Sequence, residues 1–179
     1  MTRVVIDTNV LLVANADHEG VSEECIIACI EAIDDIRHRG VVVIDDSWKL
    51  IDEYLHKLNP NKGQPEPGDA FLKWLLQCQS NPKHVARVSV NETVQDWFEE
   101  FPNHELQKVF DPPDRKFIAV AAADDGNPHV LQAADCKWLS WWPKLAEAGV
   151  RFRFVCPEDV KRFYRGKFDG PAPELPEDD

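Results

Sequence analysis

The sequence predicts an α/β fold, a three-layer α/β/α sandwich around a central, mainly parallel sheet. Short β-branched runs alternate with helical patterns along the chain, as expected when helices connect parallel strands. Residues 41–44 are continuously apolar, which is typical of a strand buried on both faces. Asp7 and Asp135 each follow an apolar run directly. Ligands of such folds bind at the carboxyl ends of the strands, near a switch in strand order, so both acids are candidate site residues.

The chain begins with a β-branched run at residues 3–6, which we expect to be a strand ending at Asp7. Residues 9–16 follow the pattern of one or two helical turns. Ser22 can cap a long helix, because isoleucines recur behind it with the 3.6-residue period, and Gly40 is placed to end that helix.

After the strand at residues 41–44, residues 47–58 carry apolar side chains on one helical face and are expected to form a helix. Residues 59–68 read NPNKGQPEPG, and this density of proline and glycine predicts a surface loop. A helix over residues 69–79 is expected next, with Asp69 as its N-cap.

The middle of the chain leaves one element open. Residues 85–90 fit either a short strand or an extended connector. Residues 92–101 have the spacing of an amphipathic helix that Pro102 ends. Residues 113–123, PDRKFIAVAAA, are expected to form a helix rich in small residues.

A strand at residues 129–133, a helix over 138–148 and a strand at 151–155 complete the predicted alternation. Residues 1–167 are therefore expected to form one domain. Residues 168–179 combine proline with acids and offer no apolar surface to bury, so we expect an acidic, disordered tail.

The charge of the chain is acidic but unevenly distributed. The 179 residues carry 20 Lys and Arg against 32 Asp and Glu, a net charge of −12. This argues against binding nucleic acid or anionic membrane through bulk charge, and no apolar stretch approaches the roughly 18 residues of a membrane span. Residues 136–167 differ, with 8 bases and 3 acids. They form either a solvated face or a local surface that attracts phosphate.

The five cysteines are odd in number and form no Cys-x-x-Cys pair. We therefore expect neither a disulfide framework nor a zinc ribbon, and a reducing, cytoplasmic setting. Cys25 and Cys29 lie one helical turn apart among isoleucines and are expected in the core. Cys136 is expected to pack rather than to act as a nucleophile.

Asp7 by itself has two interpretations, a cap of the following helix or a functional acid. Phosphohydrolases of the haloacid dehalogenase type also place an Asp after their first strand, but they need a second Asp two residues later, where this chain has Asn9. The glycine-rich nucleotide motifs, His-Glu-x-x-His and Gly-x-Ser-x-Gly are all absent from the sequence. These absences disfavour the common nucleotide, zinc and serine-hydrolase chemistries.

Four acids occur within short motifs along the chain. The motifs are VVIDTNVLL with Asp7, WKLIDEYL with Glu53, DRKFIAVAAA with Asp114 and VLQAADCKW with Asp135. In order and spacing they resemble the motifs of the PIN-domain nuclease family, over residues 3–157. The resemblance implies a PIN-like fold and an endoribonuclease that depends on Mg²⁺ or Mn²⁺. It also implies that the four acids are its metal ligands and catalytic residues.

Elementary electrostatics agrees with this interpretation. Carboxylates a few ångström apart repel one another, and one or two divalent cations with hard oxygen ligands would neutralise them. A metal-bound water can then attack a phosphodiester. Asn9 is expected to orient the first carboxylate or that water, as a further catalytic residue. Thr8, Lys137 and Arg115 are the candidate substrate-binding residues. Lys137 stands where the family often has another acid, so it either weakens a second metal site or places a cation against the scissile phosphate.

Several acids compete with these assignments. Asp52 and Glu53 flank the apolar stripe of their helix about equally, and only the family spacing favours Glu53. Asp111 precedes a proline and fits the N-cap of the next helix. Asp45 and Asp46 end the second strand, where capping is favoured and a metal role for Asp46 stays open.

The expected function is metal-dependent cleavage of RNA, with a structure-specific DNA nuclease and a catalytically silent RNA-binding scaffold as alternatives. Many bacterial members of the family are toxins, so the resemblance also allows an inhibitory, antitoxin-like partner protein or a homodimer. Trp138, Trp141 and Trp142 form the densest aromatic cluster. Core packing is the favoured role for them, while stacking on a single-stranded substrate or a dimer interface stays open.

Overall fold

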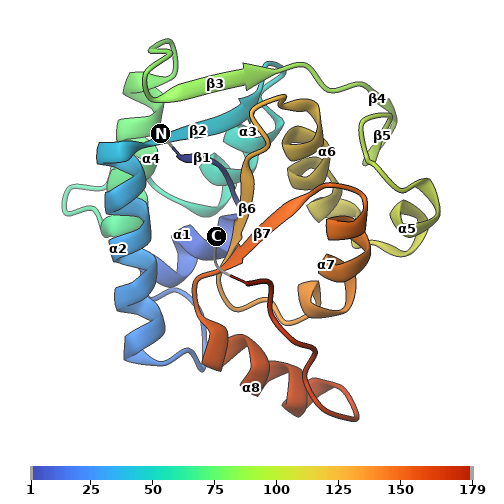
Figure 1. Ribbon diagram of the computed structural model, residues 1–179. Helices are drawn as coiled ribbons and strands as arrows, with labels where there is room; N and C mark the ends of the chain where they lie inside the picture. Colours follow the sequence, from blue (N-terminus) through green and yellow to red (C-terminus); the bar gives the residue numbers. More distant parts are fainter. Residues whose placement is uncertain (1, 178–179) are drawn as a thin grey trace.

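The computed structural model describes residues 2–177, and Figure 1 shows its central sheet flanked by helices. All five strands of this sheet are parallel, in the order β3-β2-β1-β6-β7. The predicted α/β fold with a parallel sheet is therefore confirmed. The strands are β1 (Thr2–Ile6), β2 (Gly40–Asp45), β3 (Val85–Val88), β6 (His129–Gln132) and β7 (Arg151–Phe154).

Helices occupy most of the chain between these strands, as parallel pairing requires. One of them, α6, packs on β1, β2 and β6, while α2 packs on β2 and α7 on β7. The helices are α1 (Thr8–Ala14), α2 (Glu23–Arg39), α3 (Lys49–Lys57), α4 (Pro67–Cys78), α5 (His104–Val109), α6 (Arg115–Ala123), α7 (Trp138–Glu147) and α8 (Pro157–Lys167), with a 3-10 turn η1 at Pro112–Asp114.

The strand order reverses next to β1. From β1 the chain adds β2 and then β3 on one side, and it later places β6 and β7 on the other side. The central strands β1 and β2 are strongly apolar, and β2 is buried along its whole length. Because β1 and β6 are neighbours, their carboxyl ends flank the crevice at the switch point, where ligands bind in open parallel sheets.

The helix predicted over residues 92–101 is wrong. This segment forms a small antiparallel hairpin, β4 (Glu92–Val94) and β5 (Trp97–Phe98). Asp96 turns the hairpin with a left-handed φ of 57°, and its backbone N–H donates to the Glu92 carboxylate at 2.7 Å. The buried side chain of Gln107 then binds both backbone polar groups of Phe98. Tertiary hydrogen bonds therefore override the helical spacing. The open assignment at residues 85–90 becomes a strand, β3.

Asp69 is not the N-cap of its helix, because α4 begins two residues earlier, at Pro67. Its buried carboxylate instead accepts hydrogen bonds from the Asn15 side chain at 3.1 Å and the backbone N–H of Asn59 at 2.9 Å. Gly68 lies against α1, and a Cβ added there would be 2.3 Å from the carbonyl oxygen of Leu11. The contact between α1 and α4 is therefore a backbone contact that requires glycine.

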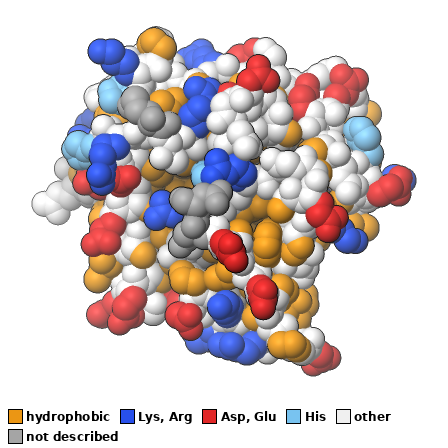
Figure 2. All heavy atoms as spheres, viewed as in Figure 1, with side chains coloured by type: hydrophobic (Ala, Val, Ile, Leu, Met, Phe, Trp, Pro, Cys, Tyr) orange, Lys and Arg blue, Asp and Glu red, His pale blue; other side chains and the backbone are white. Residues whose placement is uncertain are grey.

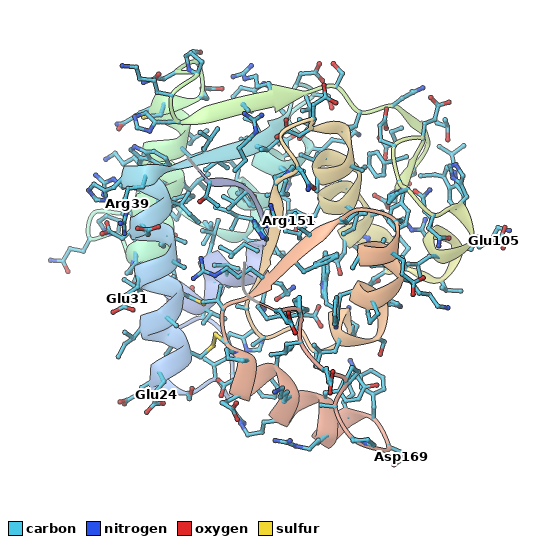
Figure 3. All side chains as sticks on the ribbon, viewed as in Figure 1. Glu24, Glu31, Arg39, Glu105, Arg151 and Asp169 are labelled. Atoms are coloured by element: carbon cyan, nitrogen blue, oxygen red, sulfur yellow. A yellow bond between two sulfur atoms is a disulfide. The ribbon has the colours of Figure 1, made fainter. Side chains whose placement is uncertain are left out.

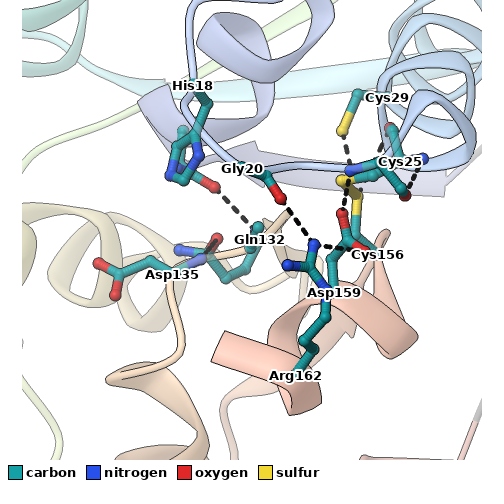
Figure 4. The surroundings of a disulfide bond; sticks show 12 residues. His18, Gly20, Cys25, Cys29, Gln132, Asp135, Cys156, Asp159 and Arg162 are labelled. Carbon is teal, nitrogen blue, oxygen red and sulfur yellow. Dashed lines mark hydrogen bonds and ion pairs between the residues drawn. A yellow bond between two sulfur atoms is a disulfide. The ribbon is translucent and has the colours of Figure 1, made fainter. Parts of the chain in front are cut away.

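The expectation that the cysteines form no disulfide is wrong. Cys25 at the start of α2 is bonded to Cys156 just before α8, across a sequence separation of 131 residues (Figure 4). Cys29 lies one turn further along α2, with its Sγ 3.7 Å from that of Cys156. Cys25 and Cys29 are buried, as the spacing predicted. The opposite side of α2 carries exposed charges, including Glu24, Glu31 and Arg39 (Figure 3).

The described part of the tail has apolar contacts that its composition did not predict. Ala172 and Leu175 pack against the core, and the indole Nε1 of Trp142 donates to the carbonyl oxygen of Glu174 at 3.1 Å. The predicted disorder of the last two residues, 178 and 179, lies outside the described residues. Trp138 is fully buried, as favoured for the aromatic cluster. Within residues 2–177, no helix is both long and apolar enough to span a membrane.

Candidate functional site

The four acids chosen from the sequence lie on four different elements and come together at one edge of the sheet. Asp7 follows β1, and Asp135 follows β6 at the switch point. Glu53 lies on α3, and Asp114 ends η1 just before α6. Each of the other three lies close enough to Asp7 for its negative charge to raise the pKa of the Asp7 carboxyl. The structure therefore brings all four together.

Asp7 is the most buried acid of this group, at 5% exposure. Its pKa is raised well above the usual range, first by burial and then by the charge of Asp114. One hydrogen bond opposes this shift, because the backbone N–H of Asn9 donates to Asp7 Oδ1 at 2.7 Å. That bond also makes Asp7 the N-cap of α1. The capping and functional interpretations of Asp7 are therefore compatible.

The pKa of the Asp114 carboxyl is also raised. Burial and the neighbouring charge of Asp135 raise its pKa to about 7, against the opposing charge of Lys137. A carboxyl that is half protonated near neutral pH is a poor anion and a strong candidate for a cation ligand, because a cation would restore its ionised form.

Glu53, rather than Asp52, faces the group. The hydroxyl of Thr8 donates to Glu53 Oε1 at 2.7 Å, and the ammonium of Lys116 pairs with the other oxygen. Asp52 is exposed. Asp45 has the capping role favoured for it, because its carboxylate accepts from the first backbone N–H groups of α3. Thr8, a predicted substrate-binding residue, thus bonds through its side chain to Glu53, one of the four acids.

Asp111 occupies the N-cap position of η1 before Pro112, as predicted, but its side chain makes no capping hydrogen bond. Its carboxylate pairs with the ammonium of Lys137. Lys137 also lies 3.7 Å from Asp135. Asp111 further raises the pKa of Asp114, so it is a fifth acid of the group. Its position three residues before Asp114, within one turn of a 3-10 helix, is the signal that could have identified it.

Lys116 is the second residue that the sequence reasoning missed. Its side chain is 13% exposed and reaches Glu53 and the carbonyl oxygen of Pro113. The predicted substrate-binding residue Arg115, one position earlier, is buried elsewhere. It donates to the carbonyl oxygens of Phe110 and Asp96 and lies over the Trp97 ring. The structure therefore assigns Arg115 to anchoring the hairpin and does not bring it to the acids.

Asn9 connects two sides of the site. Its side-chain Oδ1 accepts from the backbone N–H of Ala134 at 2.9 Å, immediately before Asp135. The Asp135 loop is held further by a bond from its own N–H to the Gln132 side chain at 3.2 Å. Asn9 therefore fixes the relative positions of the Asp7 turn and the Asp135 loop.

The acid site carries more negative than positive charge. Five carboxyl groups and two lysines give −5 + 2 = −3 when all are ionised. The residues concerned are Asp7, Glu53, Asp111, Asp114, Asp135, Lys116 and Lys137. This surplus of oxygen donors matches the preference of Mg²⁺ and Mn²⁺ for hard ligands. The donor set therefore fits the cation that the sequence implied.

The carboxylates lie near one another but do not form a closed ligand shell. Among residues 2–177, only one group of three or more histidine, cysteine or acidic residues has all its ligand atoms within 4.8 Å of one another, namely Cys25, Cys29 and Cys156. No three of the acids of the site come this close together, and lysines pair with three of them, Glu53, Asp111 and Asp135. A bound cation would have to draw carboxylates inward and compete with these lysines.

Comparison with known proteins places no constraint on this site, because the chain matches no protein-family model, no curated protein and no solved structure.

Proposed function

We propose that this protein is a metal-dependent endoribonuclease with a three-layer, PIN-like α/β/α architecture. The observation that carries the proposal is the buried Asp7 carboxyl, which three other acids surround at the switch point of the sheet. Keeping uncompensated carboxyls buried is costly, and structural capping of α1 needs only one of them. A hard divalent cation bound by these carboxylates would neutralise their charge, which accounts for the whole group.

In this proposal Asp7, Glu53, Asp114 and Asp135 would hold one or two Mg²⁺ or Mn²⁺ ions. When bound, these ions supply an activated water and stabilise the charge that develops on a phosphodiester. The residues of the chain position the ligands: Thr8 orients Glu53, and Asn9 fixes the loop before Asp135. Lys137 lies at the rim, between Asp111 and Asp135, where its ammonium can turn to a phosphate oxygen.

A second candidate is a PIN-like RNA-binding scaffold without turnover. The lysine pairs favour it, since Lys116 and Lys137 already neutralise part of the charge of Glu53 and Asp111 without a metal ion. An inhibitory partner protein or a homodimer is compatible with both candidates, and each is a proposal that rests on the family resemblance alone.

The test is cleavage of labelled single-stranded RNA, single-stranded DNA and branched DNA in Mn²⁺, Mg²⁺ and EDTA. Asp7→Asn and Asp114→Asn are compared with Asp52→Asn, a matched exposed acid next to Glu53. We expect metal-dependent RNA cleavage that the first two variants abolish and the third keeps. If only branched DNA were cleaved, the substrate would be branched DNA and not RNA. Metal-dependent thermal stabilisation with no cleavage of any substrate would favour the scaffold.

A further inference from the structure

A cleft of about 740 Å³ opens beside the acid site, and of the five acids only Asp135 is among its lining residues. Its floor includes Asn9 and Asp135, so the cleft adjoins the acid site at the switch point. One wall is formed by His18, between α1 and α2, and the other by α8. Figure 4 shows His18, Asp135 and Arg162 around this one space. Its volume lies within the roughly 300 to 1,000 Å³ of ligand-binding pockets.

The charge of the cleft is opposite to that of the acid site. Among the described residues Asp135 is the one carboxylate in its lining, while Arg162 and Lys167 line the α8 wall. Both belong to the basic segment 136–167, and Figure 2 shows Lys and Arg side chains gathered over α8 at the lower edge of that face. The structure therefore places cations of that segment next to Asp135. There they can attract a polyanion, although the net charge of the chain is negative.

The two cations differ in how far they are already engaged. Arg162 donates to the carbonyl oxygen of Gly20 at 2.7 Å and pairs with Asp159 at 3.2 Å, so it joins α8 to the loop before α2. Lys167 is exposed and makes no ion pair among residues 2–177, and its ammonium lies 5.7 Å from the centroid of the Phe168 ring. Lys167 is thus available to a ligand.

Aromatic rings complete the wall. The half-buried Phe163 ring lies 5.8 Å from the His18 ring, and the Arg162 guanidinium lies over it at 4.6 Å. Nucleic-acid sites for single strands combine such cations with aromatic surfaces that accept bases without reading sequence. A duplex would not fit its bases against this wall.

We propose that this cleft binds the single-stranded RNA on one side of the scissile phosphate, with Lys167 contacting a phosphate and His18 and Phe163 contacting a base. The proposal rests on the proposed nuclease function, because it makes Asp135 the boundary between the acid site and the strand-binding cleft. It identifies α8, outside the four acid motifs, as the element that determines how tightly substrate is held.

The test measures binding of labelled single-stranded RNA by fluorescence anisotropy, in EDTA and in Ca²⁺, at several salt concentrations. Lys167→Glu is compared with Arg165→Glu, a matched charge reversal at an exposed residue of α8 that does not line the cleft. Both variants change the net charge by the same amount. We expect Lys167→Glu to weaken binding about tenfold more than Arg165→Glu and to reduce the salt slope by about one phosphate contact.

A third variant, Phe163→Leu, keeps an apolar side chain against α1–α2 and removes the ring. We expect about tenfold weaker binding with an unchanged salt slope, since stacking is not electrostatic. Equal effects of Lys167→Glu and Arg165→Glu, or no RNA binding by the wild type, would overturn the cleft proposal. Binding with the expected variant pattern but without cleavage would keep the cleft and reject the nuclease. RNA cleavage by the wild type, together with equal effects of Lys167→Glu and Arg165→Glu on RNA binding, would keep the nuclease and reject the cleft.

Discussion

Replacing Asp114 by Asn should change how the stability of the protein depends on pH. The folded protein raises the pKa of this carboxyl from 3.8 to about 7. Below about pH 4 both the folded and unfolded states hold the proton, and the group contributes nothing. As the pH rises, the unfolded state loses its proton first, so the raised pKa lowers stability progressively until about pH 7. Asn cannot ionise and is free of this penalty.

The size of the effect follows from the shift. Two of the three shifted pKa units lie between about pH 5 and pH 7, which corresponds to roughly 2.7 kcal/mol. Asp114 is partly exposed, and screening by solvent reduces this to about 2 kcal/mol. Urea unfolding in EDTA at about pH 5 and pH 8 should therefore show the wild type losing about 2 kcal/mol more than Asp114→Asn.

Mn²⁺ provides the second half of this assay. At about pH 8 the cation should restore stability to the wild type according to its occupancy, and it should restore much less to Asp114→Asn. The matched variant Asp52→Asn should behave as the wild type does, because its carboxyl is exposed. Identical pH slopes for wild type and Asp114→Asn would refute the electrostatic reasoning. Equal stabilisation of both by Mn²⁺ would refute the role of Asp114 as a ligand.

Four further predictions concern the scaffold. Reducing the disulfide should cost up to about 5 kcal/mol of stability, from the closure entropy of a 131-residue loop, and a urea midpoint that does not move would contradict this. In oxidised Cys25→Ser, peptide mass mapping should find Cys29 bonded to Cys156, whose sulfurs lie 3.7 Å apart, rather than two free thiols. Gly68→Ala should cost about 1 to 3 kcal/mol of stability, because its Cβ meets a backbone oxygen. Arg115→Ala should cost about 3 kcal/mol, because two backbone oxygens lose a charged donor. Urea unfolding measures both losses, and values under about 0.5 kcal/mol would disprove these two arguments.

Two of the acids that the sequence predicts, Asp7 and Asp135, follow from the topology of the sheet. Asp7 and Asp135 each follow an apolar run, and parallel neighbouring strands necessarily end at the same edge. Asp111 could not be separated from a cap, because residue type and a following proline are the same for a cap and for a partner of Lys137. Lys116 depends on the direction in which one helix side chain points, which spacing does not give.

The errors elsewhere have the same physical origin. Residues 92–101 repeat apolar side chains at a helical interval, but the fate of the segment is decided by Gln107, which reaches back to Phe98. The disulfide joins residues that are 131 positions apart, and only the folded arrangement of α2 and α8 brings Cys25 to Cys156. Local patterns carry no information on such distant partners.

The disulfide also gives the folded chain an unusual connectivity. It closes residues 25–156 into a covalent ring that contains β2, β3, β6 and β7 but not β1. The central strand β1 precedes Cys25, so it belongs to an N-terminal arm outside the ring, and it pairs between β2 and β6. Asp7 travels on this arm, whereas Glu53, Asp114 and Asp135 belong to the ring. In the oxidised chain the site is therefore complete only once the arm has docked, so the acids repel one another fully only in the finished fold.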